Sequence, residues 1–330
     1  MTEVTHFMRR PHLAAYSIER LYDDIRHNLS CDITVNVRVN KHFSSGLLYR
    51  VFDMIQARHH QNDVNHVTGD VHYLTYFLDK NKTILTIHDC EMLARSKGLK
   101  RFFLWLFWFW IPEKRVSWIV VVSEETKKQL QKFINCDSKK IKVIHNPVSK
   151  LFQPSPKEFN KSRPRLLQIG TKSNKNIERL LKAVSGLSIV LVIVGKLTIQ
   201  QKKLLREYKI QFENLTGLSD QALLNEYYRC DLLLFTSTYE GFGMPIVEAQ
   251  SVGRPVVTSN ISSMPEVAGE AACFVNPYDF ESIRYGITKI INNDEYRENL
   301  INLGWQNSKR FEVRKIGEKY ETLYKSICIK

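Results

Sequence analysis

Short apolar runs rich in β-branched residues alternate with longer amphipathic stretches along the chain. This alternation predicts βαβ units and therefore parallel sheets. The run Ile189–Val194 is apolar throughout, as expected for a strand that helices cover on both faces. The predicted fold class is a doubly wound α/β fold. The expected strands are Ile33–Val39, Thr83–Ile87, Trp118–Val122, Lys142–Ile144, Arg165–Ile169, Ile189–Val194, Leu232–Phe235 and Pro255–Thr258.

The alternating pattern lapses between Val148 and Arg165, where the chain is polar and contains three prolines. Such a stretch is typical of a linker between domains. A chain of 330 residues is long enough for two cores. We therefore expect a boundary near residues 150–164, with domains at 1–155 and 156–310. Residues 311–330 form a predicted amphipathic helix that we expect to pack back toward the first domain.

Residues 102–111 are unusually aromatic, because three Trp and four Phe occur within nine residues. The segment is too short to cross a bilayer as a helix, which takes about 20 apolar residues. Aromatic rings with basic flanks are typical of a helix that lies on an anionic membrane surface. The alternative is burial in the core or at a dimer interface, because the segment has no polar face for water. The basic flanks are Lys97, Lys100, Arg101, Lys114 and Arg115.

The net charge of +14 is concentrated in the first half of the chain. Residues 1–165 carry 27 Lys and Arg against 16 Asp and Glu, an excess of 11, and residues 166–330 carry 21 against 18, an excess of 3. Nucleic acid, a phosphorylated acceptor or an anionic membrane would each suit the basic half, and solubility alone is the simpler reading.

The six cysteines are scattered without a C-x-x-C pair, and no secretory leader is apparent. We therefore expect a cytoplasmic protein, at the inner face of the membrane if it is peripheral.

The strongest chemical signal is the segment 237–249, Ser-Thr-Tyr-Glu-Gly-Phe-Gly-Met-Pro-Ile-Val-Glu-Ala, directly after an apolar strand. A strand, a glycine-containing turn and a helix with an early proline direct backbone N–H groups and the positive helix end toward an anion. Glycines at 241 and 243 let the backbone approach a ligand closely. Glu240 and Glu248 are eight residues apart, about two helical turns, so both carboxylates are expected to face one cleft. Such a site suits a pyrophosphate beside sugar hydroxyls.

The glutamate spacing and the Gly-Phe-Gly turn resemble the retaining glycosyltransferases of family 4, which have the GT-B fold. This fold consists of two Rossmann-like domains with a cleft between them. Further matching segments extend the resemblance over nearly the whole chain. They are 253–257 (Gly-Arg-Pro-Val-Val), 265–269 (Pro-Glu-Val-Ala-Gly), 65–70 (Asn-His-Val-Thr-Gly-Asp), 86–89 (Thr-Ile-His-Asp), 122–127 (Val-Ser-Glu-Glu-Thr-Lys) and 143–147 (Val-Ile-His-Asn-Pro).

The resemblance implies that the second domain binds a nucleoside-diphosphate sugar. Glu248 would hold the ribose hydroxyls, and Glu240 would contact the transferred sugar. The backbone amides of Phe242, Gly243 and Met244 would meet the sugar and the phosphates.

The resemblance also implies a diphosphate-binding lysine in the segment 170–176, Gly-Thr-Lys-Ser-Asn-Lys-Asn. Lys175 matches that lysine, and Gly170 ends the preceding strand. Many relatives have an additional arginine in this loop, which this sequence lacks, and Lys172 is the residue that could replace it. Without the resemblance, exposed loop lysines would most simply be solvated.

His88 follows the strand 83–87, at the end of a strand where open α/β sheets place their sites. From position alone it would be a structural histidine beside Asp89, but the resemblance places it at the sugar-transfer centre. By the same analogy, His66, Gly69 and Asp70 lie on the acceptor side.

The first loop departs from the family pattern, because residues 9–19 contain no glycine where many relatives have a glycine-rich loop. Acceptor contacts of that loop cannot be transferred to this chain, although Arg9 and Arg10 suit an acceptor phosphate. The chain has no D-x-D motif and no histidine cluster with further ligands, so no metal and no other cofactor is expected.

The resemblance therefore implies a retaining hexosyltransferase that uses a nucleoside-diphosphate sugar, and the missing metal motifs predict that it is metal-independent. Its acceptor would be a lipid-linked or surface-polysaccharide glycan, met at the membrane through residues 102–111. The rival enzyme readings are a GT-B sugar-nucleotide epimerase or a phosphorylase. A non-catalytic sugar-nucleotide-binding scaffold is the third alternative. Nucleic-acid binding is not expected, because the basic residues form no known reader motif.

Overall fold

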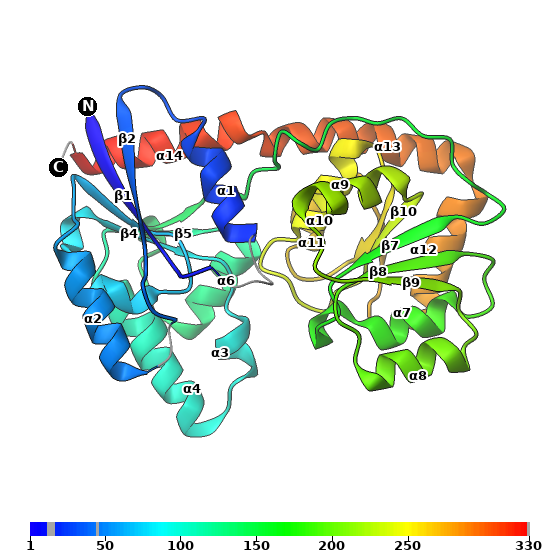
Figure 1. Ribbon diagram of the computed structural model, residues 1–330, viewed down its shortest axis with the longest axis horizontal. Coiled ribbons are helices and arrows are strands. Elements are labelled where there is room, and N and C mark those ends of the chain that lie inside the picture. Colours follow the sequence, from blue (N-terminus) through cyan, green and yellow to red (C-terminus); the bar gives the residue numbers. More distant parts are fainter. Residues whose placement is uncertain (12–16, 44–45, 329–330) are drawn as a thin grey trace. The chain divides into compact units, whose positions relative to one another are not determined.

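The chain folds into two compact units. The computed structural model describes residues 1–11, 17–43 and 46–328. The first unit consists of Met1–Pro147 together with Val313–Lys330, and the second consists of Val148–Glu312. The first unit is thus discontinuous in sequence, because the last helix belongs to it. Figure 1 labels many of the elements of both units.

A six-stranded parallel sheet in the order β2-β1-β3-β4-β5-β6 forms the centre of the first unit. The strand order reverses between β1 and β3, and ligands of open α/β sheets bind beside such a reversal. The strands are β1 (Thr2–Met8), β2 (Ile33–Val39), β3 (Val64–Val67), β4 (Thr83–Ile87), β5 (Trp118–Val121) and β6 (Ile141–Val143). The helices are α1 (Ser17–Arg26), α2 (Leu47–Arg58), α3 (Glu91–Arg95), α4 (Gly98–Leu104), α5 (Ile111–Lys114), α6 (Glu124–Phe133) and α14 (Val313–Cys328), with the 3-10 helix η1 (His72–Tyr76) and the π-helix η3 (Trp105–Trp110).

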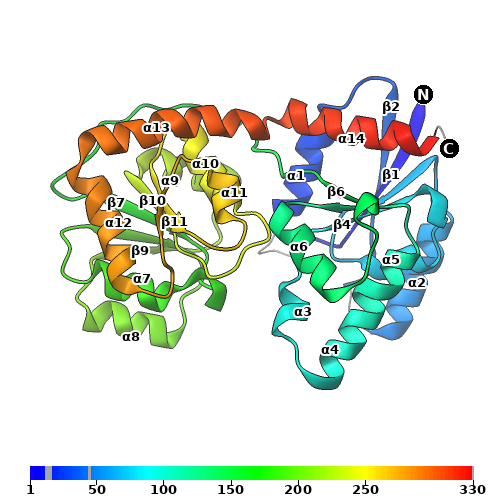
Figure 2. The ribbon, with the colours of Figure 1, turned by 180° about the vertical axis from the view of Figure 1, so that it is seen from behind.

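Each face of the first sheet has its own apolar core, because successive side chains of a strand point to opposite faces. On one face, Ile84 and Val120 pack with α1 and α14 (Figure 2). On the other face, Leu85 and Ile119 pack with α2, η1 and α6. The last helix supplies Ile316, Tyr320, Leu323, Tyr324 and Ile327 to the first of these cores. Burial of such side chains is worth roughly 1.5–3 kcal/mol each, so α14 is an integral part of this unit.

The aromatic segment is divided between a buried and an exposed face. Phe109 is buried in the core, and the Trp105 indole donates to the Phe133 carbonyl at 2.8 Å. The π-helical backbone of η3 is held by two hydrogen bonds from η1. His72 Nδ1 donates to the Trp108 carbonyl at 2.7 Å, and the Tyr76 hydroxyl donates to the Phe107 carbonyl. Burial was one of the two expected environments, and it applies to the inner face. The exposed side chains are Leu99, Phe102, Phe103, Phe107 and Trp110.

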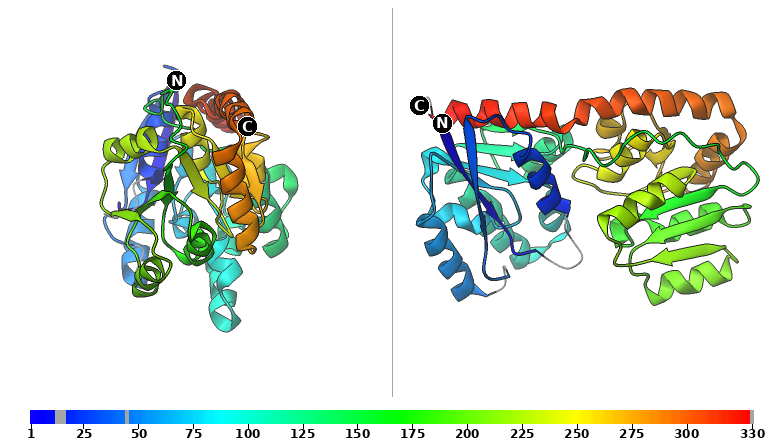
Figure 3. Two further views of the ribbon diagram at one scale, coloured as in Figure 1. Left: turned by 90° about the vertical axis from the view of Figure 1, so that its right-hand side faces the viewer. Right: turned by 45° about the horizontal axis from the view of Figure 1, so that its top comes forward.

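The second unit has a six-stranded parallel sheet in the order β12-β11-β10-β7-β8-β9. The strands are β7 (Arg165–Ile169), β8 (Val190–Val194), β9 (Phe212–Leu215), β10 (Leu232–Phe235), β11 (Val256–Ser259) and β12 (Cys273–Val275). The helices are α7 (Ile177–Val184), α8 (Ile199–Glu207), α9 (Asp220–Arg229), α10 (Met244–Val252), α11 (Met264–Ala268), α12 (Phe280–Asn292) and α13 (Asp294–Ser308). One of its cores joins Leu191 and Leu232 of the sheet to Leu181 of α7 and Ile287 of α12. Figure 3 shows the unit from two further sides.

The stretch 150–164, expected as a linker, packs on the second unit. The Phe152 ring meets the Tyr227 ring edge-on at a centroid distance of 5.4 Å. The carboxylate of Asp231 accepts from the Lys157 ammonium group. These contacts are long-range in sequence, so the pattern of prolines and polar residues does not reveal them. The stretch is thus part of the second unit, and the division between the units precedes it.

Four strands were not indicated by the sequence pattern, namely β1, β3, β9 and β12. Polar residues interrupt the first three, and β12 is only three residues long. In β3, for example, Asn65 is buried and donates to the Gln61 side chain at 3.1 Å. Such polar residues are satisfied by hydrogen bonds inside the protein. The pattern of apolar and polar residues therefore fails to predict these four strands.

Candidate functional site

Two predicted donor loops meet at the point where the strand order of the second sheet reverses. This reversal lies between β7 and β10, which are neighbours in the sheet. Residues 170–176 follow β7, and residues 236–243 follow β10. Because the strands are parallel, both loops leave the same edge of the sheet. The backbone N–H of Thr238 donates to the Asn174 carbonyl at 2.8 Å and joins the loops directly.

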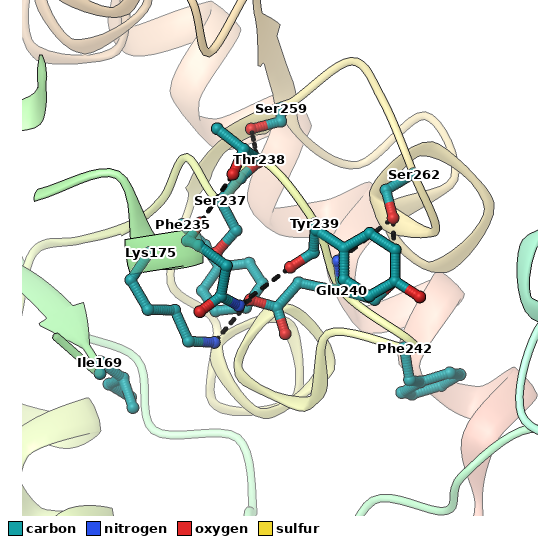
Figure 4. A network of polar contacts seen from close by, with 12 residues as sticks. Ile169, Lys175, Phe235, Ser237, Thr238, Tyr239, Glu240, Phe242, Ser259 and Ser262 are labelled. Carbon is teal, nitrogen blue, oxygen red and sulfur yellow. Dashed lines mark hydrogen bonds and ion pairs between the residues drawn. The ribbon is translucent and has the colours of Figure 1, made fainter. Parts of the chain in front are cut away.

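Lys175 and Glu240 form an ion pair at the centre of this edge (Figure 4). The Lys175 Nζ lies 2.6 Å from Glu240 Oε1, and the side chains are 16% and 14% exposed. Asn174 donates to the same carboxylate oxygen at 3.3 Å and to the Tyr239 carbonyl at 3.0 Å. The ammonium group also lies 4.5 Å from the centre of the Phe235 ring. A cation and a carboxylate are thus held together in a partly buried position, where their charges are less screened than in water.

Gly170 provides the space for the Lys175 side chain. Its φ is +87°, and a Cβ at this position would lie 2.8 Å from Lys175 Cε. Any other residue would therefore be strained and would displace the lysine stem. Lys172 is in the same loop, but its side chain is exposed, and its carbonyl accepts from the Lys175 N–H at 2.8 Å. The structure brings Lys175, and not Lys172, to Glu240.

The turn before α10 is fixed by two serines that follow β11. Ser262 Oγ accepts from the Glu240 N–H at 3.2 Å and donates to the Glu240 carbonyl at 2.8 Å. Ser263 donates to the Phe242 carbonyl at 2.8 Å. Gly243 caps α10 with a φ of +107°, and Met244 is the first residue of the helix. The backbone at the start of α10 is thus held in one conformation.

Phe242 points into the protein rather than out of the turn. Its side chain is buried and meets the Phe311 ring edge-on at 5.5 Å. Only the backbone of this residue is therefore available to a ligand.

Glu248 does not share the contacts of Glu240. It is 4% exposed within α10, and its Oε2 accepts from the Tyr227 hydroxyl at 2.5 Å. Tyr227 belongs to α9 and is itself buried, and its carbonyl accepts from Arg254 Nε at 3.1 Å. The two carboxylates thus have different partners, since Glu240 pairs with Lys175 and Glu248 with a buried tyrosine. That both face one cleft stays a prediction.

The predicted acceptor-side residues lie near the strand-order reversal of the first sheet. Arg9 follows β1, and its guanidinium contacts Asp70 at 3.2 Å and Glu19 at 3.1 Å. Gly69 is buried beside the Arg9 side chain. His88 follows β4 and is partly exposed, with Nε2 at 2.8 Å from the Thr68 carbonyl.

The loop without glycine, residues 9–19, follows β1 at the same edge of the first sheet and is described in part. Arg10 donates to the Lys41 carbonyl at 3.0 Å. Part of the loop without glycine, residues 12–16, lies outside the described residues.

His66 was predicted to lie on the acceptor side, and the structure corrects this prediction. It is completely buried, with Nδ1 at 2.8 Å from the Tyr324 hydroxyl and Nε2 at 2.8 Å from Thr86 Oγ1. Both ring nitrogens are therefore engaged inside the protein. His6 also contacts the Tyr324 hydroxyl, at 2.9 Å, so the two histidines bind α14 to the sheet. The sequence pattern did not indicate β3, so the burial of His66 within a strand was not expected.

Acid is expected to weaken this histidine core. Burial, and to a lesser extent the nearby His88, lowers the pKa of His66 to about 3, whereas a free imidazole titrates near 6.5. The unfolded chain therefore binds the proton more readily, and stability is complete above pH 6.5 and falls as the pH drops toward 3, by up to about 1.4 kcal/mol per pH unit. Urea unfolding between pH 7.5 and 4.5 should show a shallower pH slope for His66→Gln than for the wild type. Equal slopes would assign the acid sensitivity to other groups.

Sequence reasoning missed the residues that hold the donor-side carboxylates. Tyr227 is hidden in an amphipathic helix pattern, and only the distance to Glu248 reveals its role. Asn174 and Asn176 had a signal, because both flank Lys175. The Asn176 amide donates to the Thr236 carbonyl at 3.0 Å, and its backbone is left-handed with a φ of 58°.

The described part of the chain contains no group of three or more His, Cys, Asp or Glu that could hold a metal ion. Within the same residues, no helix is long and apolar enough to span a bilayer.

Two units, each built on a parallel six-stranded sheet flanked by helices, are the architecture of the GT-B fold. HepE of Anabaena, solved in complex with UDP and glucose, has the same fold with a TM-score of 0.78. The match covers 99% of this chain and 100% of HepE at 15% identity. The chain belongs to glycosyltransferase family 4: residues 12–150 match the model described as Glycosyltransferase Family 4, and residues 149–306 match Glycosyl transferases group 1.

Two relatives are named as mannosyltransferases. RfbU, the O-antigen chain mannosyltransferase of Salmonella typhimurium, is 29% identical over 221 residues, which cover 64% of this chain and 61% of RfbU. O-antigen chain mannosyltransferase B of Escherichia coli is 39% identical over 92 residues, which cover 28% of this chain and 24% of that protein. The matched part of this chain thus spans less than two thirds of either relative.

Proposed function

We propose that the protein transfers a mannosyl unit from a nucleoside-diphosphate sugar to a hydroxyl of a lipid-linked or surface-polysaccharide glycan, with retention and without a metal. The observation that carries the proposal is the Lys175–Glu240 pair at the strand-order reversal. The names of the two relatives support mannose and a polysaccharide acceptor. The HepE complex supports a uridine or similar nucleotide as the carrier.

In the proposed reaction, the bond between the anomeric carbon and the diphosphate oxygen breaks. A bond forms from the same carbon to the acceptor oxygen on the same face of the sugar. The acceptor proton passes to the departing phosphate oxygen. Lys175 and the amides at the start of α10 stabilise the negative charge that develops on the diphosphate. Such preorganised cations and dipoles can replace a metal ion.

The ion pair suggests how a donor would enter. A diphosphate would compete with Glu240 for the Lys175 ammonium group. Glu240 would then accept hydrogen bonds from sugar hydroxyls, while Asn174 keeps the carboxylate in place. Without a donor, each side chain is held by the other near its working position, so little reorganisation is needed.

His88 has a defined tautomer in this proposal. Its Nε2 donates to the Thr68 carbonyl, because a carbonyl oxygen can only accept. In the neutral ring the lone pair is then on Nδ1, and we assign that atom to a hydroxyl of the transferred sugar.

Glu248 would bind the ribose hydroxyls, with Tyr227 as a positioning residue. Tyr227→Phe removes a hydrogen bond to a buried carboxylate, which is worth roughly 1.5–3 kcal/mol. We expect the KM for the donor to rise about tenfold or more, with a smaller change in kcat. Tyr228→Phe is the matched control, because that hydroxyl donates to the Leu151 carbonyl at 3.3 Å instead. A lower melting temperature with an unchanged donor KM would show that Tyr227 only supports the fold.

A ligand panel and a product analysis test the proposal as a whole. UDP-, GDP-, dTDP- and ADP-sugars, GDP-mannose among them, are added in a thermal-shift assay, since a ligand of the folded state raises its apparent stability. The stabilising donor is then incubated with and without a glycan acceptor. We expect mannose transfer only with the acceptor. A new sugar nucleotide without an acceptor would instead identify an epimerase, and a requirement for inorganic phosphate would identify a phosphorylase.

A further inference from the structure

Two neighbouring parts of the first unit expose large apolar side chains. On α2, Leu48, Phe52 and Ile55 are 84%, 45% and 45% exposed, and their spacing places them in one stripe along the helix. On α4 and η3, the exposed side chains are the five named above, from Leu99 to Trp110. Monomeric proteins rarely expose contiguous apolar patches of more than a few hundred Å². The two faces therefore need an explanation beyond chance exposure.

The helices α2 and η3 are in contact with each other, and the rings of the aromatic segment are held in place. The guanidinium of Arg50 on α2 lies 4.9 Å from the centre of the Trp108 ring on η3. Figure 1 draws α2 and α4 in the same part of the first unit. The Phe103 and Phe107 rings stack at 6.2 Å, and Phe102 meets Phe103 edge-on at 5.7 Å. Because the inner face of η3 is fixed to η1, the outer rings cannot turn inward without breaking these contacts.

The exposed charges within the two segments are of one sign. Residues 41–58 and 97–115 contain only two carboxylates, Asp53 and Glu113, and both are buried. Asp53 contacts His42 at 3.1 Å, and Glu113 pairs with Lys140 at 3.0 Å. The exposed charged side chains described in the two segments are Lys41, Arg58, Lys97, Lys100, Arg101 and Lys114.

We propose that α2, α4 and η3 together form a docking surface for an anionic lipid bilayer. The apolar rings would lie at headgroup depth, and the lysines and arginines would meet the lipid phosphates or carboxylates. A second copy of the chain fits less well, because a two-fold contact would place each basic patch against itself. A nucleic acid would match the charges but would leave the leucine and phenylalanine side chains without an apolar partner.

This inference goes beyond the proposed function, because it concerns α2 as well as the aromatic segment and requires no sugar chemistry. It implies that the protein lies on the membrane by two elements that are about 50 residues apart in sequence. A surface with two contact elements fixes the orientation of the first unit, whereas a single helix could rotate about its axis.

Vesicle co-sedimentation of the full chain, without donor or acceptor, tests the proposal. Vesicles of phosphatidylcholine that contain roughly one third phosphatidylglycerol are compared with pure phosphatidylcholine vesicles, at low and at high salt. We expect binding to the anionic vesicles that salt weakens, with a blue shift of tryptophan fluorescence. Leu48→Ser with Phe52→Ser, and separately Phe102→Ser with Phe103→Ser, should each weaken binding about tenfold or more. Lys97→Glu with Lys100→Glu should also weaken it about tenfold or more.

Ile199→Ser is the matched control, because Ile199 is 90% exposed on the second unit and should not affect vesicle binding. All substituted residues are exposed, and equal melting temperatures would establish that the variants are folded. Wild-type binding by the Leu48 and Phe52 variant would exclude α2 from the surface. If the wild type ignores vesicles but forms dimers that the same substitutions disrupt, the surface is a contact between copies, and the proposal is overturned.

Discussion

Glu240→Gln is expected to reduce sugar transfer by roughly 100- to 1,000-fold while leaving the protein folded. Glutamine has the shape of glutamate and can still accept from Lys175, so the free energy of unfolding should change by less than about 1.5 kcal/mol. The charge that orients the transferred sugar is lost, however. Because this contact would strengthen in the transition state, kcat should fall more than the donor affinity. Steady-state kinetics with the donor identified by the ligand panel measure both quantities.

The matched control for Glu240 is Glu270→Gln, because Glu270 is an exposed glutamate of the same unit. It should transfer sugar at the wild-type rate. Undiminished turnover by Glu240→Gln would exclude this carboxylate from the reaction. The donor site would then have to lie elsewhere than at the strand-order reversal of the second sheet.

Lys175→Met is expected to lower kcat/KM by roughly 100- to 1,000-fold, because it removes the cation that we assign to the leaving diphosphate. Methionine keeps the length of the side chain and can still contact the Phe235 ring. The variant leaves Glu240 without its ion-pair partner, so stability should fall by about 1–3 kcal/mol. Inhibition by the free nucleoside diphosphate should weaken in parallel, which equilibrium binding of that nucleotide measures directly.

Lys203→Met is the matched control for this lysine, because Lys203 is exposed on α8. Lys172→Met is a second comparison, since Lys172 is in the same loop but does not reach Glu240. If Lys172→Met abolished nucleotide binding while Lys175→Met did not, the exposed lysine would be the diphosphate ligand, and the assignment from the ion pair would be wrong.

The sequence predicted the doubly wound fold correctly because parallel strands leave a strong local signal. Runs such as Ile189–Val194 are apolar throughout, and the strand observed there is Val190–Val194. β1 and β3 lack that signal because polar residues interrupt their apolar runs. The fold accommodates these residues through distant partners, such as Tyr324 of α14, which contacts a histidine of each strand. Local patterns carry no information on such partners. The misplaced linker has the same cause, since its polar residues bind side chains more than 70 residues away.

The candidate site was predictable in its residue types but not in its contacts. The Gly-Phe-Gly turn and the two lysines indicated where an anion would bind, and the structure joins Lys175 to Glu240. The separate environment of Glu248 depends on Tyr227, which reaches it from another helix. His66 shows the opposite error, because a motif position suggested chemistry where the structure shows a buried core residue. Motif spacing thus located the loops, and tertiary packing decided which side chains they present.

The discontinuous first unit constrains the order in which the protein can fold during synthesis. The second unit is continuous, so its residues 148–312 can fold once they have left the ribosome. The first sheet must wait for α14, which follows the whole second unit in the chain, before Ile84 and Val120 are covered on that face. Until α14 has left the ribosome, the nascent first unit exposes apolar strand surface, and a ribosome that stalls before residue 313 leaves that surface uncovered.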